Sequence, residues 1–191
     1  MTATRWLYLA RHGDAAETGG LTDTGREQAK LLAERLSDVP LAIVTHSPLQ
    51  RAAETAAAVH APSTEIWAAA GDYVPFVPDP VPPVLEGYTP QERADGARWA
   101  AEALDRFAKP VEGDIETHEL VITHAFLVAW FVRDALGAPP ERWLGLNSAN
   151  CALTVIRYTP DRPPALVLFN DLSHLPPELR WTGFSSGLVP R

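Results

Sequence analysis

The stretch Trp6-Leu7-Tyr8-Leu9-Ala10-Arg11-His12-Gly13 decides the fold of this chain. Its first five residues are apolar, which predicts a buried strand. Arg11, His12 and Gly13 follow at the carboxyl end of that strand, where open α/β sheets bind their ligands. A guanidinium suits phosphate, an imidazole can act as a nucleophile or an acid–base group, and a glycine lets the backbone approach an anion. The stretch therefore predicts an anion site at one edge of a sheet.

Apolar strands alternate with helices along the rest of the chain. We expect strands at Thr4–Arg11, Leu41–Thr45, Thr64–Ala68, Glu119–Thr123, Cys151–Tyr158 and Ala165–Asn170, and helices at Gly25–Leu36, Pro48–Val59, Pro90–Lys109 and Ala125–Leu136. Strands that are separated by helices form parallel sheets with helices on both faces. The pattern predicts an α/β fold, a three-layer α/β/α sandwich with a mostly parallel central sheet.

One proline-rich segment interrupts this alternation. Residues 71–90 hold six of the eighteen prolines, which excludes a regular helix or a central strand. Long irregular inserts in compact domains are commonly lids or binding loops, so we expect a short Pro-rich cap loop over the site. The expected organisation is one domain over residues 1–184. Residues 185–191, Ser-Ser-Gly-Leu-Val-Pro-Arg, match the remnant of a thrombin-site tag and are set apart from the fold.

Composition narrows the classes of function. The chain has 191 residues, a net charge of −8 and only two lysines, which argues against nucleic-acid binding. Cys151 is the one cysteine, so no internal disulfide is expected, as suits a reducing cytoplasm. We expect no signal peptide, and the longest apolar run, 125–132, is too short to span a membrane. Abundant Arg, Ala and Pro indicate a GC-rich bacterial genome, so the prediction is a bacterial, cytoplasmic protein whose oligomeric state the sequence does not define.

Two further strand ends carry candidate residues. Arg51 falls in the first turn of a predicted helix, where a cation is unfavourable for the helix dipole and needs another reason. His124 follows a buried strand and begins a helix, whose N-terminus attracts anions. Taken alone, Arg51 is typical of a solvent-exposed helix position, and His124 is typical of a buried histidine in the core. Together with Arg11 and His12 they predict a phosphate pocket.

At this point the chain resembles the histidine phosphatase superfamily, which contains cofactor-dependent phosphoglycerate mutases and many phosphatases. The resemblance extends to Leu175 and rests on four ordered motifs: Arg11-His12-Gly13, Leu21-Thr22-Asp23-Thr24-Gly25 with Gln28-Ala29, Ser47-Pro48-Leu49-Gln50-Arg51-Ala52 with Glu54-Thr55-Ala56, and Val121-Ile122-Thr123-His124. It implies that His12 accepts the phosphoryl group. It also implies that Arg11, Arg51 and His124 hold the phosphate oxygens and stabilise their charge during transfer.

The resemblance also implies a general acid in the segment after the third strand, because an alkoxide leaves badly without a proton. Asp72 is the first choice, since the run from Asp72 to Pro80 resembles the equivalent segment of the protein-phosphatase members. Glu86 is the alternative. Gly13 and Thr18 are the other expected substrate contacts, although the mutases have an asparagine where Thr18 stands.

We expect no metal site and no cofactor. The chain has no His-Glu-x-x-His motif, no close histidine pair and one cysteine. It also lacks a glycine-rich lysine loop of the Walker type, so nucleotide triphosphate chemistry of that kind is not expected.

The interval between Arg51 and Arg93 contains no Lys or Arg, although it includes the whole insert. A glycerate mutase must bind a carboxylate and a second phosphate, for which the resemblance implies basic groups in the insert. We therefore interpret the chain as a phosphatase that hydrolyses phosphomonoesters through a phosphohistidine on His12, with a phosphorylated small molecule or a phosphoprotein as its partner. The alternative is a phosphoprotein phosphatase, or a partner-binding protein of low turnover, and a mutase is disfavoured.

Overall fold

A six-stranded sheet forms the centre of the computed structural model, which describes residues 1–184, 187 and 189. The predicted tag remnant at 185–191 therefore falls largely outside the described residues. The sheet has the order β4-β3-β6-β2-β7-β8. Its strands are β2 (Arg5–Arg11), β3 (Leu41–His46), β4 (Thr64–Ile66), β6 (Thr117–Thr123), β7 (Leu153–Thr159) and β8 (Arg162–Asp171). A separate antiparallel pair joins β1 (Thr2–Ala3) to β5 (Val111–Glu112).

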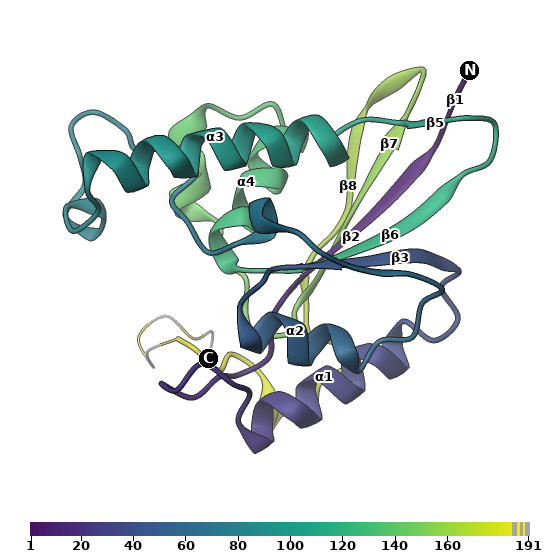
Figure 1. Ribbon diagram of the computed structural model, residues 1–191, viewed down its shortest axis with the longest axis horizontal. Coiled ribbons are helices and arrows are strands. Elements are labelled where there is room, and N and C mark those ends of the chain that lie inside the picture. The colour runs from purple at the N-terminus through teal and green to yellow at the C-terminus, as the bar shows by residue number, and fades with distance from the viewer. Residues whose placement is uncertain (185–186, 188, 190–191) are drawn as a thin grey trace.

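Helices cover both faces of the central sheet (Figure 1). The helices α1 (Asp23–Arg35) and α2 (Gln50–Ala57) pack on one face, and α3 (Pro90–Phe107) and α4 (Ala125–Ala135) pack on the other. The expected three-layer α/β/α sandwich is confirmed. Short 3-10 turns add η1 (Ala68–Ala70), η2 (Pro83–Leu85), η3 (Pro140–Gly145) and η4 (Pro177–Leu179). No described helix is both long enough and apolar enough to cross a membrane.

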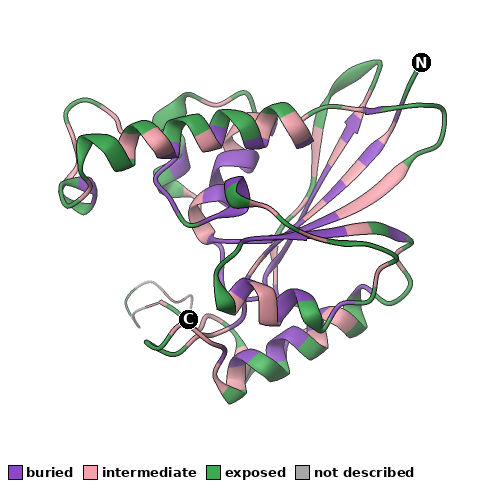
Figure 2. Ribbon diagram, viewed as in Figure 1, coloured by how far each residue is buried: buried purple, intermediate pink, exposed green. Residues whose placement is uncertain are grey.

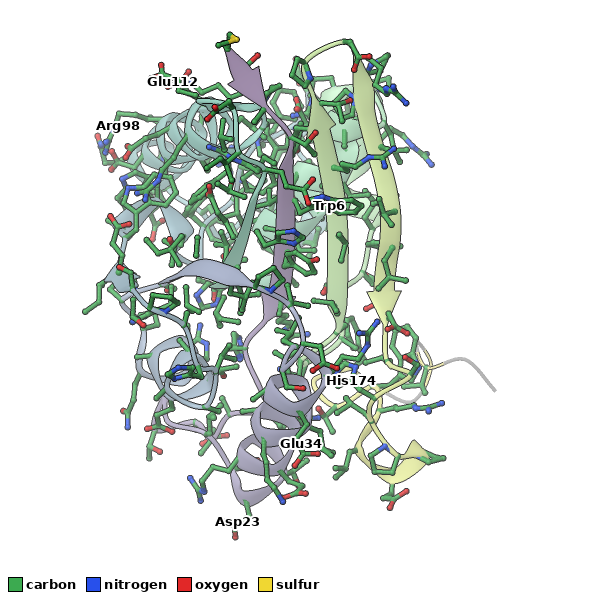
Figure 3. The ribbon with its side chains drawn as sticks, turned by 90° about the vertical axis from the view of Figure 1, so that its right-hand side faces the viewer. Trp6, Asp23, Glu34, Arg98, Glu112 and His174 are labelled. Carbon is green, nitrogen blue, oxygen red and sulfur yellow. The ribbon has the colours of Figure 1, made fainter. Side chains whose placement is uncertain are left out.

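The apolar stretch of β2 is explained by burial on both sides. Leu7 and Leu9 contribute to the core cluster under α3 and α4, whereas Tyr8 and Ala10 face the cluster under α1 and α2. Figure 2 shows the resulting buried band through the middle of the molecule. The surrounding strands bury the hydrogen-bonding edges of β2, because it pairs with β6 on one side and β7 on the other.

The direction of the strands sets which residues share the ligand edge. The pairs β4–β3, β3–β6 and β6–β2 are parallel, so the sheet is mostly parallel as expected. The pairs β2–β7 and β7–β8 are antiparallel. Since β7 runs against β2, the residues that precede β7 lie at the edge where β2, β3 and β6 end.

Two helix starts refine the expected boundaries. α1 begins at Asp23, because the side chain of Thr22 accepts a hydrogen bond from the backbone N–H of Gly25 and caps the helix. α2 begins at Gln50 and not at Pro48 as expected. The hydroxyl of Ser47 accepts a hydrogen bond from the N–H of Leu49 at 3.3 Å, which holds the preceding residues in a turn.

The proline-rich insert, residues 71–90, packs against the helical layer of α3 and α4. It is irregular apart from η2, as expected. Tyr73, Val74 and Leu85 are buried in the core cluster on this side of the sheet. The indole N–H of Trp143 donates to the carbonyl of Phe76 at 3.0 Å. These buried side chains anchor the insert on this layer, and Asp72 at its start lines the cavity described below. Its role as a cap loop over the site stays a prediction.

Candidate active site

A cavity of about 290 Å³ lies at the carboxyl edge of the parallel strands. Arg11 and His12 reach it from the end of β2, Arg51 from the first turn of α2, and Asp72 from the start of the insert. The other described residues that line it are Asp14, Ala15, Ala16, Asn150 and Gly183. Four of the five predicted catalytic residues therefore line one cavity, although they are far apart in the sequence.

The ring of His12 is held in one tautomer. Its Nδ1 donates to the carbonyl of Gly13 at 2.7 Å, because a carbonyl can only accept. Nε2 consequently carries the lone pair, and it accepts a hydrogen bond from Nε of Arg51 at 3.1 Å. Burial lowers the pKa of His12 to about 3, against the opposing effect of the Gly13 hydrogen bond. The imidazole is therefore neutral at pH 7, with the lone pair that a nucleophile needs on the side of Arg51.

Arg51 connects the charged groups of the site. Its Nη2 donates to Oδ2 of Asp72 at 2.8 Å and lies 3.5 Å from Nδ1 of His124. With the bond to His12, one guanidinium contacts three predicted catalytic residues. These contacts supply the reason for a cation in the first turn of α2, where the helix dipole alone disfavours it.

His124 is buried behind this layer and is absent from the described residues that line the cavity. Its Nε2 shares a hydrogen bond of 2.9 Å with the hydroxyl of Ser47, and its Nδ1 lies 3.6 Å from Oδ2 of Asp72. Burial, and then the positive charges of Arg51 and Arg11, lower the pKa of His124 to about 3. His124 therefore lies behind Arg51 and Asp72 with a neutral ring, and its contact with a bound phosphate stays a prediction.

Arg11 is fixed by the residues that precede β7 and by the C-terminal segment. Its Nη1 donates to the carbonyl of Ser148 at 3.0 Å, and its guanidinium lies 5.5 Å from the ring centroid of Phe184. A Cβ on Gly183 would lie 2.5 Å from Oδ1 of Asn150 and 3.0 Å from Nη2 of Arg11. In Figure 1 the C-terminal segment correspondingly lies beside the loop after β2. A side chain at Gly183 would displace these groups of Asn150 and Arg11, and the φ of +81° at Gly183 favours glycine.

A hydrogen-bonded chain ties this C-terminal segment to the loop after β2. Asn150 donates from Nδ2 to the carbonyl of His12 at 2.9 Å and accepts at Oδ1 from the hydroxyl of Thr182 at 3.2 Å. Gln28 donates to the same hydroxyl at 2.8 Å and accepts from the N–H of Asp14 at 2.8 Å. Sequence reasoning assigned no role to Asn150, Gln28 or Thr182. The polar run before an antiparallel β7 was the signal that could have identified Asn150.

Gly13, a predicted substrate contact, is absent from the described residues that line the cavity. Its N–H donates to the hydroxyl of Thr55 at 3.0 Å, so it is not available to an anion. A Cβ at Gly13 would lie 2.6 Å from the carbonyl oxygen of Gly25. The glycine is required for close packing of the loop against α1, which is a different physical reason from the one predicted.

Two other predicted contacts also lie away from the described cavity lining. Thr18 is exposed in a turn that is closed by the N–H of Gly19 donating to the carbonyl of Ala16 at 2.9 Å. Glu86 is exposed at the C-terminal end of η2, where the buried side chain of Leu85 fixes the chain. Of the two candidate acids, the structure places Asp72 in the cavity and Glu86 outside its described lining.

The charges of the cavity suit an oxyanion. Two guanidinium groups, from Arg11 and Arg51, face it together with the carboxylates of Asp14 and Asp72. The hydroxyl of Thr22 donates to Asp14 at 2.7 Å. Paired guanidinium groups bind and stabilise the oxygens of a phosphoryl group. Among the described residues, no group of three or more His, Cys, Asp or Glu is placed to hold a metal ion.

The lowered pKa values of His12 and His124 predict that stability falls in mild acid. The pKa of His124 is about 3 in the folded protein, whereas an unperturbed histidine has a pKa of 6.5. Between these values the unfolded chain binds a proton that the folded protein does not. The free energy of unfolding should therefore fall as the pH drops below 6.5, by at most about 1.4 kcal/mol per pH unit for each of His12 and His124. Urea unfolding at pH 7, 6 and 5 measures this slope.

The matched variants for this measurement are His124→Asn and His60→Asn. His124→Asn should reduce the slope because it removes one buried titrating group. His60 is exposed, so His60→Asn should leave the slope unchanged. An equal slope in the wild type and in His124→Asn would contradict the depressed pKa of His124.

Known protein families and relatives agree with this geometry. The family model of the histidine phosphatase superfamily, branch 1, matches residues 7–69 and 84–172, and its gap falls in the insert. The serine/threonine-protein phosphatase Pgam5, mitochondrial, of Caenorhabditis elegans is 35% identical over 190 residues, covering 92% of this chain and 66% of the relative. The human PGAM5 protein of the same name is 31% identical over 193 residues, covering 92% of this chain and 65% of the human protein. The chain thus spans slightly less than two thirds of the length of these relatives.

Solved structures share the fold at lower identity. Bacillus stearothermophilus YhfR superposes with a TM-score of 0.67 at 23% identity, covering 89% of this chain and 98% of that structure. Phosphoserine phosphatase from Entamoeba histolytica, in complex with 3-phosphoglyceric acid, has a TM-score of 0.64 at 22% identity, covering 90% and 99%. A phosphoglycerate mutase from Plasmodium falciparum has a TM-score of 0.63 at 23% identity, covering 91% and 95%.

The relatives overturn the predicted source and compartment. A bacterial, cytoplasmic protein was expected from composition, whereas these curated relatives are animal proteins that are named as mitochondrial. The prediction was wrong because residue usage and a low cysteine count do not specify an organism or a compartment. The expected fold family, in contrast, is confirmed. The family model matches most of the chain, and Arg11, His12 and Arg51 from two of the ordered motifs line one cavity, so the chain belongs to the histidine phosphatase superfamily.

Proposed function

We propose that this protein is a phosphatase that hydrolyses phosphomonoesters, with phosphoserine or phosphothreonine side chains of proteins as its substrates. The observation that carries the proposal is the cavity in which a neutral His12 faces Arg11, Arg51 and Asp72. The names of the curated relatives, which are serine/threonine-protein phosphatases, support the substrate class. The fold shared with a phosphoserine phosphatase is consistent with it.

In the first step the phosphoryl group binds between Arg11, Arg51 and His124. The lone pair on Nε2 of His12 attacks phosphorus, a P–N bond forms, and the P–O bond to the substrate oxygen breaks. Asp72 in its protonated form gives its proton to that oxygen, so the substrate leaves as an alcohol. The bond from Nδ1 of His12 to the carbonyl of Gly13 keeps the ring oriented and stabilises the charge that it acquires.

In the second step water replaces the alcohol beside Asp72. The carboxylate takes a proton from the water as its oxygen attacks phosphorus. The P–N bond breaks, its electron pair returns to Nε2 of His12, and inorganic phosphate leaves. Asp72 thereby takes back the proton that it gave to the leaving alcohol.

The first two cations that follow the insert in the sequence are already engaged, which disfavours substrates with a second anionic group. Arg93 donates to the carbonyls of Tyr88 at 2.9 Å and Leu85 at 3.2 Å. Arg98 pairs with Asp95 at 2.9 Å. Among the described residues that line the cavity, only Arg11 and Arg51 are cationic, and both are assigned to the phosphate.

A substrate panel tests the proposal. Phosphothreonine and phosphoserine peptides should be hydrolysed with kcat/KM at least about 100-fold above that for 3-phosphoglycerate, because the described lining of the cavity offers no further cation to its carboxylate. Release of inorganic phosphate and conversion of 3-phosphoglycerate to its 2-isomer are measured in parallel. p-Nitrophenyl phosphate serves as the reference substrate. Isomerisation of 3-phosphoglycerate at a rate comparable to peptide hydrolysis would contradict the proposal, as would the absence of peptide hydrolysis by an enzyme that cleaves the reference.

A further inference from the structure

An apolar groove of about 320 Å³ adjoins the active-site cavity. Arg11 and Gly183 line both, so the two spaces share a wall. The groove is built from four separate parts of the chain: Val84 and Leu85 in the insert, Phe126 in α4, Trp143 and Leu144 in η3, and Phe184 near the C-terminus. None of these side chains takes part in the proposed reaction.

The floor of the groove is rigid. Trp143 is buried, and its ring meets that of Phe126 edge-on, with centroids 4.8 Å apart. Its indole N–H is fixed by the bond to the carbonyl of Phe76. Leu85 is fully buried beside it. A ligand that enters the groove thus meets a surface that is already formed, which lowers the cost of ordering on binding.

The rim of the groove is apolar and accessible. Val84 is 69% exposed and Leu144 is 36% exposed, and they come from two different elements. Arg11 is the one charged residue among the described residues that line the groove. The guanidinium of Arg11 is assigned to the phosphate, and Asn147 carries the one side-chain amide of the described lining. The rest of the surface offers a neighbouring group mainly apolar contact.

We infer that this groove binds an aliphatic or aromatic side chain of the substrate, two residues away from the phosphorylated residue. The inference rests on the proposed function. In an extended peptide, side chains two residues apart lie on the same face and about 7 Å from each other. A phosphate held at the shared wall therefore places that side chain over the groove. The groove makes the enzyme selective for the sequence around the phosphorylated residue.

Paired phosphothreonine peptides test this inference. Each pair differs only in leucine or glutamine at position −2 or +2, with alanine elsewhere. At one of these two positions we expect kcat/KM to be about tenfold higher for the leucine peptide than for the glutamine peptide, since the groove removes the leucine side chain from water. Leu144→Gln and Val84→Gln should each reduce this preference to about twofold or less. Inhibition by inorganic phosphate should keep its Ki in both variants, because neither side chain contacts the phosphate.

Val167→Gln is the matched control. Val167 is an exposed apolar residue on β8, outside the groove, so its replacement should keep the tenfold preference. Equal rates for the leucine and glutamine peptides would overturn the inference and leave the proposed function intact. A leucine preference that survives in both groove variants would also overturn it. Failure to hydrolyse any phosphopeptide would instead refute the proposed function and, with it, the inference.

Discussion

Replacement of His12 by alanine is expected to lower kcat at least about 10⁴-fold for both p-nitrophenyl phosphate and phosphothreonine peptides. The reason is that the covalent route begins at Nε2, whose lone pair is available because Nδ1 carries the proton that bonds to the carbonyl of Gly13. Arg11, Arg51 and His124 would still bind the substrate, so KM should change far less than kcat. Steady-state kinetics on protein of confirmed thermal stability measure the effect.

His46→Ala is the control for this variant. His46 is buried to the same extent as His12, and its Nδ1 also bonds to the carbonyl of the next residue, at 2.8 Å. It is absent from the described lining of the cavity. His46→Ala should therefore retain most of the activity of the folded wild type. A His12→Ala enzyme that is folded and within about tenfold of the wild-type rate would show that another group is the nucleophile.

Asp72→Asn is expected to have the second-largest effect, and one that depends on the leaving group. For phosphothreonine peptides kcat/KM, which reports the first step, should fall about 10²- to 10⁴-fold, because the alcohol no longer receives a proton from the enzyme. For p-nitrophenyl phosphate the loss of kcat/KM should be less than about tenfold, since nitrophenolate leaves readily without protonation. Comparison of the two substrates separates this role from a general loss of structure, which would lower both rates alike.

Glu86→Gln is the matched comparison for Asp72→Asn. Glu86 is exposed outside the described cavity lining, so this variant should hydrolyse both substrates at near wild-type rates. The asparagine in Asp72→Asn also keeps an oxygen that can accept from Nη2 of Arg51, which limits displacement of that guanidinium. If Glu86→Gln shows the leaving-group dependence and Asp72→Asn does not, the general acid is Glu86.

Much of the site could be predicted because it follows strand ends. The strands that carry Arg11 and His124 are parallel neighbours, and Arg51 follows the strand on the far side of β6, so their carboxyl ends meet at one edge. Asn150 could not be found by the same reasoning. It bonds to His12 across 138 residues of sequence, and it reaches this edge only because β7 is antiparallel.

The course of the insert was less accessible to prediction. Its prolines exclude regular structure. The same prolines and aromatic residues are compatible with a loop over the site and also with a loop that packs on the helical layer, so the sequence does not distinguish the two. The structure buries Tyr73 and Val74 on the α3 side, which anchors the insert on the helical layer. Asp72 nevertheless stays at the cavity, because the hydroxyl of Thr123 at the end of β6 donates to the carbonyl of Ala70 at 2.7 Å. That contact between distant segments is tertiary and leaves no local pattern.

The most direct test of the central claim is to trap the covalent intermediate. The enzyme is mixed with a ³²P-labelled phosphothreonine peptide, quenched with alkali within milliseconds to seconds, and digested for mass spectrometry. The account predicts a phosphoryl group on His12 that is stable in base and labile in acid, that forms and decays fast enough to support turnover, and that is missing in His12→Ala. Phosphate on another residue, or turnover without any protein-bound phosphate, would contradict it.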